Sequence, residues 1–164
     1  MDAIMGSISD SGTGYAAPIK ALGRSILPAL ALAAASLPSA AQGAELSVTL
    51  QGLRSERGQI RLCLTRDPRH FPNCAGDPHA VKRSLPSSHA ASLSLDIPPG
   101  DYALSVIHDE NGNGRLDTFL RVPREGFGFS RNPGIRMGPP RFEETRFHVA
   151  EEAVAQSVRI RYIL

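Results

Sequence analysis

Residues 92–107, SLSLDIPPGDYALSVI, contain two β-strand patterns joined by a tight turn. From residue 92 to 97, leucine or isoleucine alternates with a polar residue, as in a strand with one buried face. The Pro-Pro-Gly sequence at 98–100 ends this strand because it favours a turn. Residues 102–107 are apolar on both faces, which predicts a central strand covered on both sides.

Two further runs with period-two alternation lie N-terminal to this stretch. Residues 46–50 and 60–64 each place an apolar side chain at every second position. The polar, turn-like residues 55–58 separate them, so the sequence predicts that the two strands form a hairpin.

Strand patterns recur near the C-terminus, at residues 147–149 and 158–164. Beyond residue 45 no window keeps a helical period for three turns, and residues 151–156 predict at most one short helical turn. Short strands separated by turns indicate an all-β fold. We expect an antiparallel β-sandwich of about seven strands, with a closed barrel as the alternative.

The composition excludes several classes of protein. Charges nearly balance, with 18 basic against 16 acidic residues, which argues against a nucleic-acid-binding arm. The hydrophobic fraction of 41% is enough for a packed core. Aromatic residues make up 5% and tryptophan is absent, so no stacking platform for bases or sugars is expected.

Residues 1–41 have the pattern of a cleaved signal peptide. Lys20 and Arg24 precede an apolar run at 25–37, and small residues then precede the cut. A buried or membrane helix is the alternative, but the run is short and contains proline. We expect a periplasmic or secreted protein in which residues 42–164 form a single β-sandwich domain and do not span a membrane.

The only two cysteines are Cys63 and Cys74. Their spacing fits neither a CxxC redox pair nor a zinc knuckle. In an oxidising compartment such a pair usually forms a disulfide, which would close the proline-rich loop at residues 66–80. Two free thiols, or a metal pair helped by His70 and His79, are the alternatives.

Residues 109–117, DENGNGRLD, match the first nine positions of a calcium-binding loop. A hard cation needs six to eight oxygens, which alternate residues of a curling loop can supply, and glycine at position 6 allows the sharp reversal. The predicted calcium ligands are Asp109, Asn111, Asn113, Arg115 through its carbonyl, Asp117, and Glu125 from outside the loop.

This loop differs from an EF-hand. Position 12 is Leu120 rather than glutamate, and no helices are expected on either side. Glu125, Asp101 or water would have to supply the missing oxygens, so the affinity should be weak. The alternative is a plain hairpin turn, because the strong turn signal Asn-Gly occurs twice.

Residues 121–141, RVPREGFGFSRNPGIRMGPPR, form a long stretch with five arginines and little periodicity. Ordered loops of this length are uncommon unless they are functional. One interpretation is a basic, aromatic binding loop for an anionic ligand such as a cell-surface glycan, built from Arg124, Phe127, Phe129 and Arg131. The other is that the two phenylalanines cap the end of the sandwich.

Catalysis has little support in the sequence. The five histidines are scattered and none belongs to an HExxH or His-x-His arrangement, and no G-x-S-x-G elbow is present. His108 and Asp109 are adjacent, but neighbours on a strand face opposite sides. A structural histidine at a strand end is the favoured interpretation.

Three segments resemble a known family: PPGDYALSVIHDENGNGRLDT at 98–118, PREGFGFSRN at 123–132 and GPPRFEE at 138–144. They are similar to the bacterial domain of unknown function 2141, a family of small exported proteins. The resemblance implies an immunoglobulin- or transthyretin-like sandwich and no known activity. The motif positions it carries over are His108, Asp109, Asn111, Asn113, Gly114, Asp117, Pro123, Glu125, Gly126, Gly128, Phe129 and Ser130.

Together these features predict an exported, envelope-associated, calcium-stabilised module that binds a ligand or a partner, either an envelope protein or a glycan. One alternative is a hydrolase-like enzyme that uses His108, Asp109 and Glu125. The other is a purely structural module without a metal.

Overall fold

The computed structural model describes residues 43–134, 136 and 138–164. The expected signal peptide, residues 1–41, lies outside this part of the chain. No helix among the described residues is long and apolar enough to cross a membrane.

Almost all regular structure in the described residues is β-strand, which confirms the predicted all-β class. The strands are β1 (Ala44–Gln51), β2 (Gln59–Thr65), β3 (Val81–Pro86), β4 (Ser92–Ile97), β5 (Gly100–Asp109), β6 (Thr118–Phe119), β7 (Val122–Pro123), β8 (Gly126–Phe129), β9 (Phe147–Val149) and β10 (Val154–Arg159). The helical elements are the 3₁₀ turn η1 (Ser87–His89) and the four-residue α1 (Phe142–Thr145). Short strands in this number leave about half of the described residues in turns and connections.

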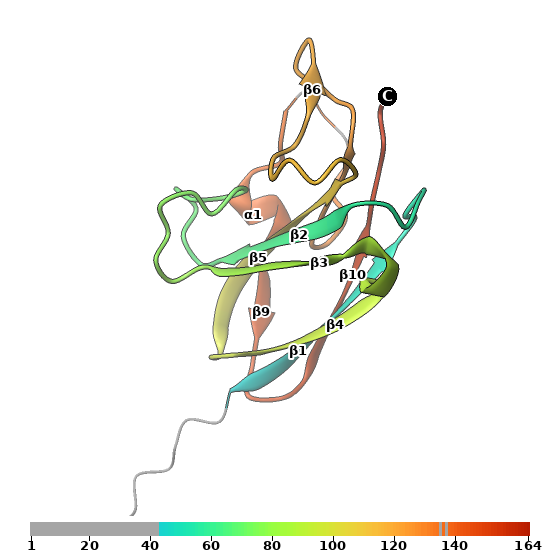
Figure 1. The fold of residues 1–164 in the computed structure, drawn as a ribbon. Coiled ribbons are helices and arrows are strands. Elements are labelled where there is room, and N and C mark those ends of the chain that lie inside the picture. The colour runs from blue at the N-terminus through green and yellow to red at the C-terminus, as the bar shows by residue number, and fades with distance from the viewer. Residues whose placement is uncertain (1–42, 135, 137) are drawn as a thin grey trace, which may run out of the picture. The chain divides into compact units, whose positions relative to one another are not determined.

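Two sheets make up the body of the domain (Figure 1). One has the order β10-β1-β4, and the other has the order β3-β2-β5-β8, with β9 pairing to one end of β5. The pairing of β1 with β10 is parallel, and the remaining pairs are antiparallel. A small β6-β7 ribbon carries the connection that follows the 109–117 loop.

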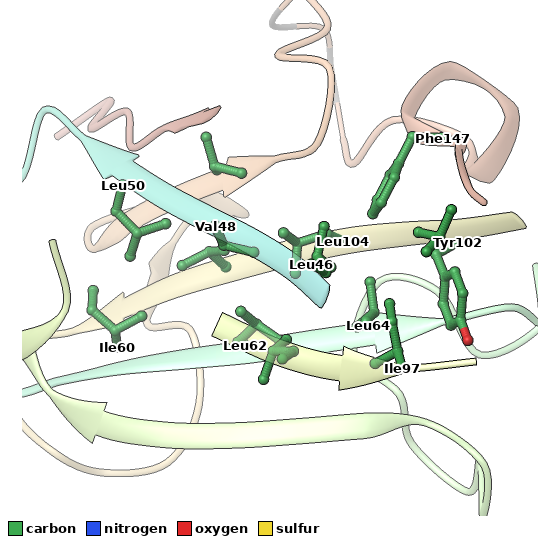
Figure 2. Close-up of a cluster of buried hydrophobic side chains, with 14 of the residues drawn as sticks. Leu46, Val48, Leu50, Ile60, Leu62, Leu64, Ile97, Tyr102, Leu104 and Phe147 are labelled. Atoms are coloured by element: carbon green, nitrogen blue, oxygen red, sulfur yellow. The ribbon is translucent and has the colours of Figure 1, made fainter. Parts of the chain in front are cut away.

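The hydrophobic core lies between these two sheets, where side chains from β1 and β4 meet those from β2 and β5 (Figure 2). Leu46, Ile60, Leu64 and Leu104 have no solvent exposure. Alternation explains this arrangement, because every second residue of each strand faces the opposite sheet. Burial of such side chains is the main favourable contribution to folding.

The predicted hairpin between residues 46–50 and 60–64 is wrong. β1 pairs with β10 and β4, whereas β2 pairs with β3 and β5, so the two strands lie in different sheets. The chain crosses from one layer to the other at residues 52–58. Their apolar faces therefore meet across the core, which requires the same alternation as a hairpin does.

Three other expectations need correction. The last strand is β10, at Val154–Arg159, and the later residues form only an isolated bridge at Arg161. The helical turn expected at 151–156 is absent, because these residues bend and enter β10. The stretch 121–141 is not a single irregular loop, since its middle forms β8.

Candidate functional site

The 109–117 loop begins at the buried end of β5. Asp109 is completely buried, and its carboxylate accepts backbone N–H groups from within the loop. Asn113 donates to Oδ1 at 3.1 Å, and Gly114 donates to Oδ2 at 2.7 Å. Gly114 has a φ of +85°, a conformation that favours glycine. The motif's first aspartate and its glycine therefore close the turn together.

The two asparagines and the last aspartate of the loop form a second group. Asn111 and Asn113 each donate a side-chain N–H to the carboxylate of Asp117, at 2.8 and 2.9 Å. These bonds, first from Asn113 and then from Asn111, lower the pKa of Asp117 below its ordinary value. The amide oxygens accept N–H groups from Asn113 and Arg115 at 3.0 Å each. Each such oxygen keeps a second lone pair that a cation could use.

Glu125 lies outside the loop and fastens both of its ends. Its Oε1 atom accepts the backbone N–H of Glu110 at 3.1 Å, and Oε2 accepts that of Asp117 at 2.9 Å. The side chain is buried. A hollow of about 330 Å³ lies beside it and is lined by Arg57, Glu110, Asn111, Asp117, Arg124 and Glu125. Three of the six predicted calcium ligands therefore share one hollow.

The loop has the oxygen atoms that calcium prefers, but it is poor in charge. In the described part of the chain, no three His, Cys, Asp or Glu side chains gather as metal ligands. The side chain of Arg115 is mostly exposed, and its Nε atom lies 3.5 Å from Oδ1 of Asp117. With Asp109 bonded to N–H groups and Asp117 shared between two amides, the loop also holds its shape by hydrogen bonds.

His108 is a structural residue at the end of β5. It is fully buried, with Nε2 at 2.8 Å from the carbonyl of Arg57 and Nδ1 at 2.6 Å from the Tyr162 hydroxyl. Since a carbonyl only accepts, Nε2 carries the proton and Nδ1 accepts from the tyrosine. Both ring nitrogens therefore have hydrogen-bond partners within the domain. The carboxylates of Asp109 and Glu125 make their hydrogen bonds to backbone N–H groups and not to His108.

Arg54 joins the loop to the C-terminal segment. Its Nε atom donates to the carboxylate of Glu110 at 3.1 Å, and its guanidinium stacks 4.3 Å above the Tyr162 ring. The hydrogen bond from Arg54 lowers the pKa of Glu110. Burial raises the pKa of Tyr162, which therefore keeps its proton in neutral solution. The pattern of the sequence did not indicate this contact, because its partners lie far apart in the chain.

β8 presents glycine to one side and phenylalanine to the other. A Cβ atom on Gly128 would lie 2.7 Å from Val158 and 2.8 Å from the carbonyl of Arg159. The strand therefore packs directly against the opposite sheet, and Phe127 exchanges two backbone hydrogen bonds with Arg161, at 3.0 and 2.8 Å. The phenylalanine rings point to the outer face.

A groove of about 700 Å³ lies over that outer face of the β3-β2-β5-β8 sheet. Its lining contains eight basic residues and, among the described residues, no aspartate or glutamate. The basic residues are Arg61, Lys82, Arg83, Arg115, Arg121, Arg136, Arg159 and Arg161. Two of the eight have a carboxylate partner: Arg115 pairs with Asp117, and Arg136 with Glu144 at 3.1 Å.

The predicted binding-loop residues are divided between different places. Phe127 and Phe129 line the groove, half-buried, with ring centroids 6.0 Å apart. Arg124 lines the hollow beside Glu125 instead. Arg131 donates to the carbonyl of Arg146 at 3.1 Å and does not line the groove. The groove's basic residues come mostly from other segments, which sequence spacing could not reveal.

The predicted cysteine pair lies at disulfide distance, with the Cα atoms of Cys63 and Cys74 5.8 Å apart. Cys63 belongs to β2 and lines the groove, so the pair brings the 66–80 loop next to this sheet. The hydroxyl of Ser105 on β5 donates to the carbonyl of Pro72 in the same loop.

The DUF2141 family model, described as "Uncharacterized protein conserved in bacteria", matches residues 48–157. The chain belongs to this family. The match runs from β1 into β10, so the DUF2141 region includes the 109–117 loop, Glu125 and the four strands under the groove. No curated protein and no solved structure matches the chain.

Proposed function

We propose that this DUF2141 protein is an exported, non-catalytic binding module of the bacterial envelope whose groove takes an anionic ligand. The observation that carries the proposal is the charge of the groove. Six of its eight basic side chains have no carboxylate within 4.0 Å in the described part of the chain. Several cations held together in a concave site favour a negatively charged ligand.

Arg61 lies at the centre of this argument. Its side chain is half-buried on β2, and it makes no hydrogen bond or ion pair with the described residues. A guanidinium that is partly removed from water without a partner is unfavourable, and an anion would remove that cost. Gly114 of the loop lies against it, because a Cβ there would be 3.4 Å from Nη1.

The proposal is tested by calorimetric titration of the protein with inorganic tripolyphosphate. Binding should weaken at least fivefold in Arg61→Gln and should fall as salt is added, because exposed charges are screened. Arg57→Gln is the matched control, since Arg57 is exposed and lies outside the groove. Equal weakening in both variants, or no binding at all, would show that the groove is not an anion site.

Calcium is proposed as a stabiliser of the loop that forms one wall of the groove. The support is the completely buried carboxylate of Asp109, which has no basic side chain within 4.0 Å in the described part of the chain. The free lone pairs of the Asn111 and Asn113 amides add oxygens near Asp117. The ion would stabilise the folded loop and would take no part in a chemical reaction.

A further inference from the structure

We infer that the groove binds a single-chain amphiphile that carries an anionic phosphate head and one linear apolar tail. This rests on the proposed function, the binding of an anion, and adds the chemical class of the ligand. The observation behind it is the order of side chains across the sheet.

The outer face of the sheet changes from basic to apolar in strand order. Strand register places Lys82 of β3 opposite Cys63 of β2, and Arg61 of β2 opposite Ile107 of β5. Ile107 in turn lies opposite Phe127 of β8. Directly paired residues of neighbouring strands point to the same face, so these side chains lie in two adjacent rows on one face of the sheet, Lys82–Cys63 and Arg61–Ile107–Phe127. The β3-β2 side of these rows is cationic and the β8 side is apolar.

The basic edge fits a phosphate better than a carboxylate. Arg61 and Lys82 lie on adjacent strands at diagonal positions, close enough for both to contact one head group. A phosphate monoester carries up to two negative charges and three terminal oxygens, and guanidinium groups bind it in bidentate fashion. A single carboxylate has one negative charge and two oxygens, so it can pair with fewer of these donors than a phosphate can.

The apolar edge fits a hydrocarbon tail. Phe127 and Phe129 are half-buried and pack against each other, and Phe129 also lies 5.9 Å from the ring of Phe71. The apolar lining continues through Pro139, Pro140 and Ile163. The groove volume of about 700 Å³ lies in the range of sites for one small ligand.

The hydrogen-bonding groups of the groove disfavour a sugar. Sugar hydroxyls need acceptors as well as donors, and the described lining has no carboxylate. The side-chain amide of Asn132 already has a partner for its oxygen and for its nitrogen. Its Oδ1 atom accepts the backbone N–H of Arg159 at 2.7 Å, and its Nδ2 atom donates to the backbone carbonyl of Ser157 at 2.8 Å. The other neutral polar side chains of the lining are Asn73, Ser84, Ser105 and Thr118, so most of what the groove offers is positive charge and apolar surface, which match an amphiphilic anion.

The test is a calorimetric titration of the full chain with monomeric ligands below their micelle concentrations. The ligands are dodecyl phosphate, octyl phosphate, inorganic phosphate, uncharged dodecyl maltoside and cationic dodecyltrimethylammonium. Dodecyl phosphate should bind one to one and about tenfold more tightly than octyl phosphate, because each partly buried methylene adds to affinity. The uncharged and cationic ligands should bind at least tenfold more weakly than dodecyl phosphate.

Two variants show which residues hold the phosphate head and which hold the apolar tail. Arg61→Gln should weaken both alkyl phosphates by a similar factor, whereas Phe127→Leu should reduce the difference between dodecyl and octyl phosphate. Arg57→Gln should change neither, and an unaltered melting temperature in each variant shows that the fold is intact.

If inorganic phosphate binds as tightly as dodecyl phosphate, the anion site stands and the amphiphile is wrong. If dodecyl maltoside binds as tightly as dodecyl phosphate, or if no ligand binds, both proposals fail.

Discussion

The carboxylate of Glu125 accepts the backbone N–H of Asp117 at 2.9 Å, while its other oxygen holds the N–H of Glu110. Glu125 directly precedes β8, whereas Glu110 directly follows β5. The residue thus joins the two parts of the chain that carry the strongest family resemblance, the 109–117 loop and the segment that begins at Pro123. Loop and strand form one structural unit.

Removing that carboxylate should loosen the loop. Glu125→Ala leaves two partly buried N–H groups without an acceptor, which should lower the free energy of unfolding by about 1–2 kcal/mol. Urea denaturation measures the loss, and hydrogen exchange should show faster exchange at the amides of Glu110 and Asp117. Glu152→Ala is the control, because Glu152 is exposed. Equal exchange rates in wild type and Glu125→Ala would contradict the clamp.

Calcium should raise the melting temperature. If the dissociation constant is about 10⁻⁴ M, then about 10 mM calcium adds roughly 2.7 kcal/mol to the free energy of unfolding. Magnesium should add much less, since it demands a tighter octahedron. Asp117→Asn and Asp109→Ala should each abolish the response.

Glu125→Gln separates two roles: a lost calcium response makes Glu125 a ligand, and a retained response makes it a positioning residue. No calcium response in the wild type would refute the calcium site and leave the groove unaffected.

Gly128→Ala should destabilise the domain by about 2 kcal/mol or more, because the new methyl group meets Val158 and the backbone of Arg159. Gly134→Ala is matched to it, since among the described residues no atom outside its chain neighbours lies within 4 Å of a Cβ at that position. Thermal unfolding of the two variants compares them directly. Similar melting temperatures would mean that β8 does not pack closely against the opposite sheet.

Reduction of the predicted disulfide between Cys63 and Cys74 should cost about 3 kcal/mol, as expected for a loop closed by cysteines 11 positions apart. Denaturation with and without a reductant measures this difference. The double variant Cys63→Ala/Cys74→Ala should be insensitive to the reductant. A reductant effect of the same size in that variant would show that the loss arises elsewhere.

The Arg54–Glu110 contact should make stability depend on pH. Because the pKa of Glu110 in the folded protein lies below its ordinary value of 4.5, the contribution is fully present above that pH. It is lost as the pH falls through the lowered pKa. Glu110→Gln should therefore cost about 1 kcal/mol or less at pH 7 and almost nothing in strong acid. A loss that does not change with pH would contradict the ion pair.

Sequence patterns predicted the strands whose inward positions carry large apolar side chains and missed two others. β1, β2, β4 and β9 follow the expected alternation, and β5 is buried on both faces as expected. β3 was missed because half of its residues are polar and exposed, and β8 because its inward positions are glycines. The supposed hairpin failed for a different reason: alternation shows which residues are buried and not which strands pair.

The candidate site, like the fold, could be predicted from the sequence only in part. The 109–117 loop is visible in the sequence because its oxygen-bearing residues recur within one short segment. The groove is not, because register brings together Arg61, Ile107 and Phe127 from distant segments. The link made by Glu125 could be expected only in part, since spacing alone does not distinguish a metal ligand from an acceptor of backbone N–H groups.

The two-sided character of β8 has a practical consequence. The same four residues close the gap to the opposite sheet with glycine and form the floor of the groove with phenylalanine. A molecule seated on that floor would stiffen a strand on which the cohesion of the domain depends. Occupancy of the groove should therefore be visible as a rise in melting temperature, so a thermal screen of amphiphilic compounds can search for the natural ligand without any assay of activity.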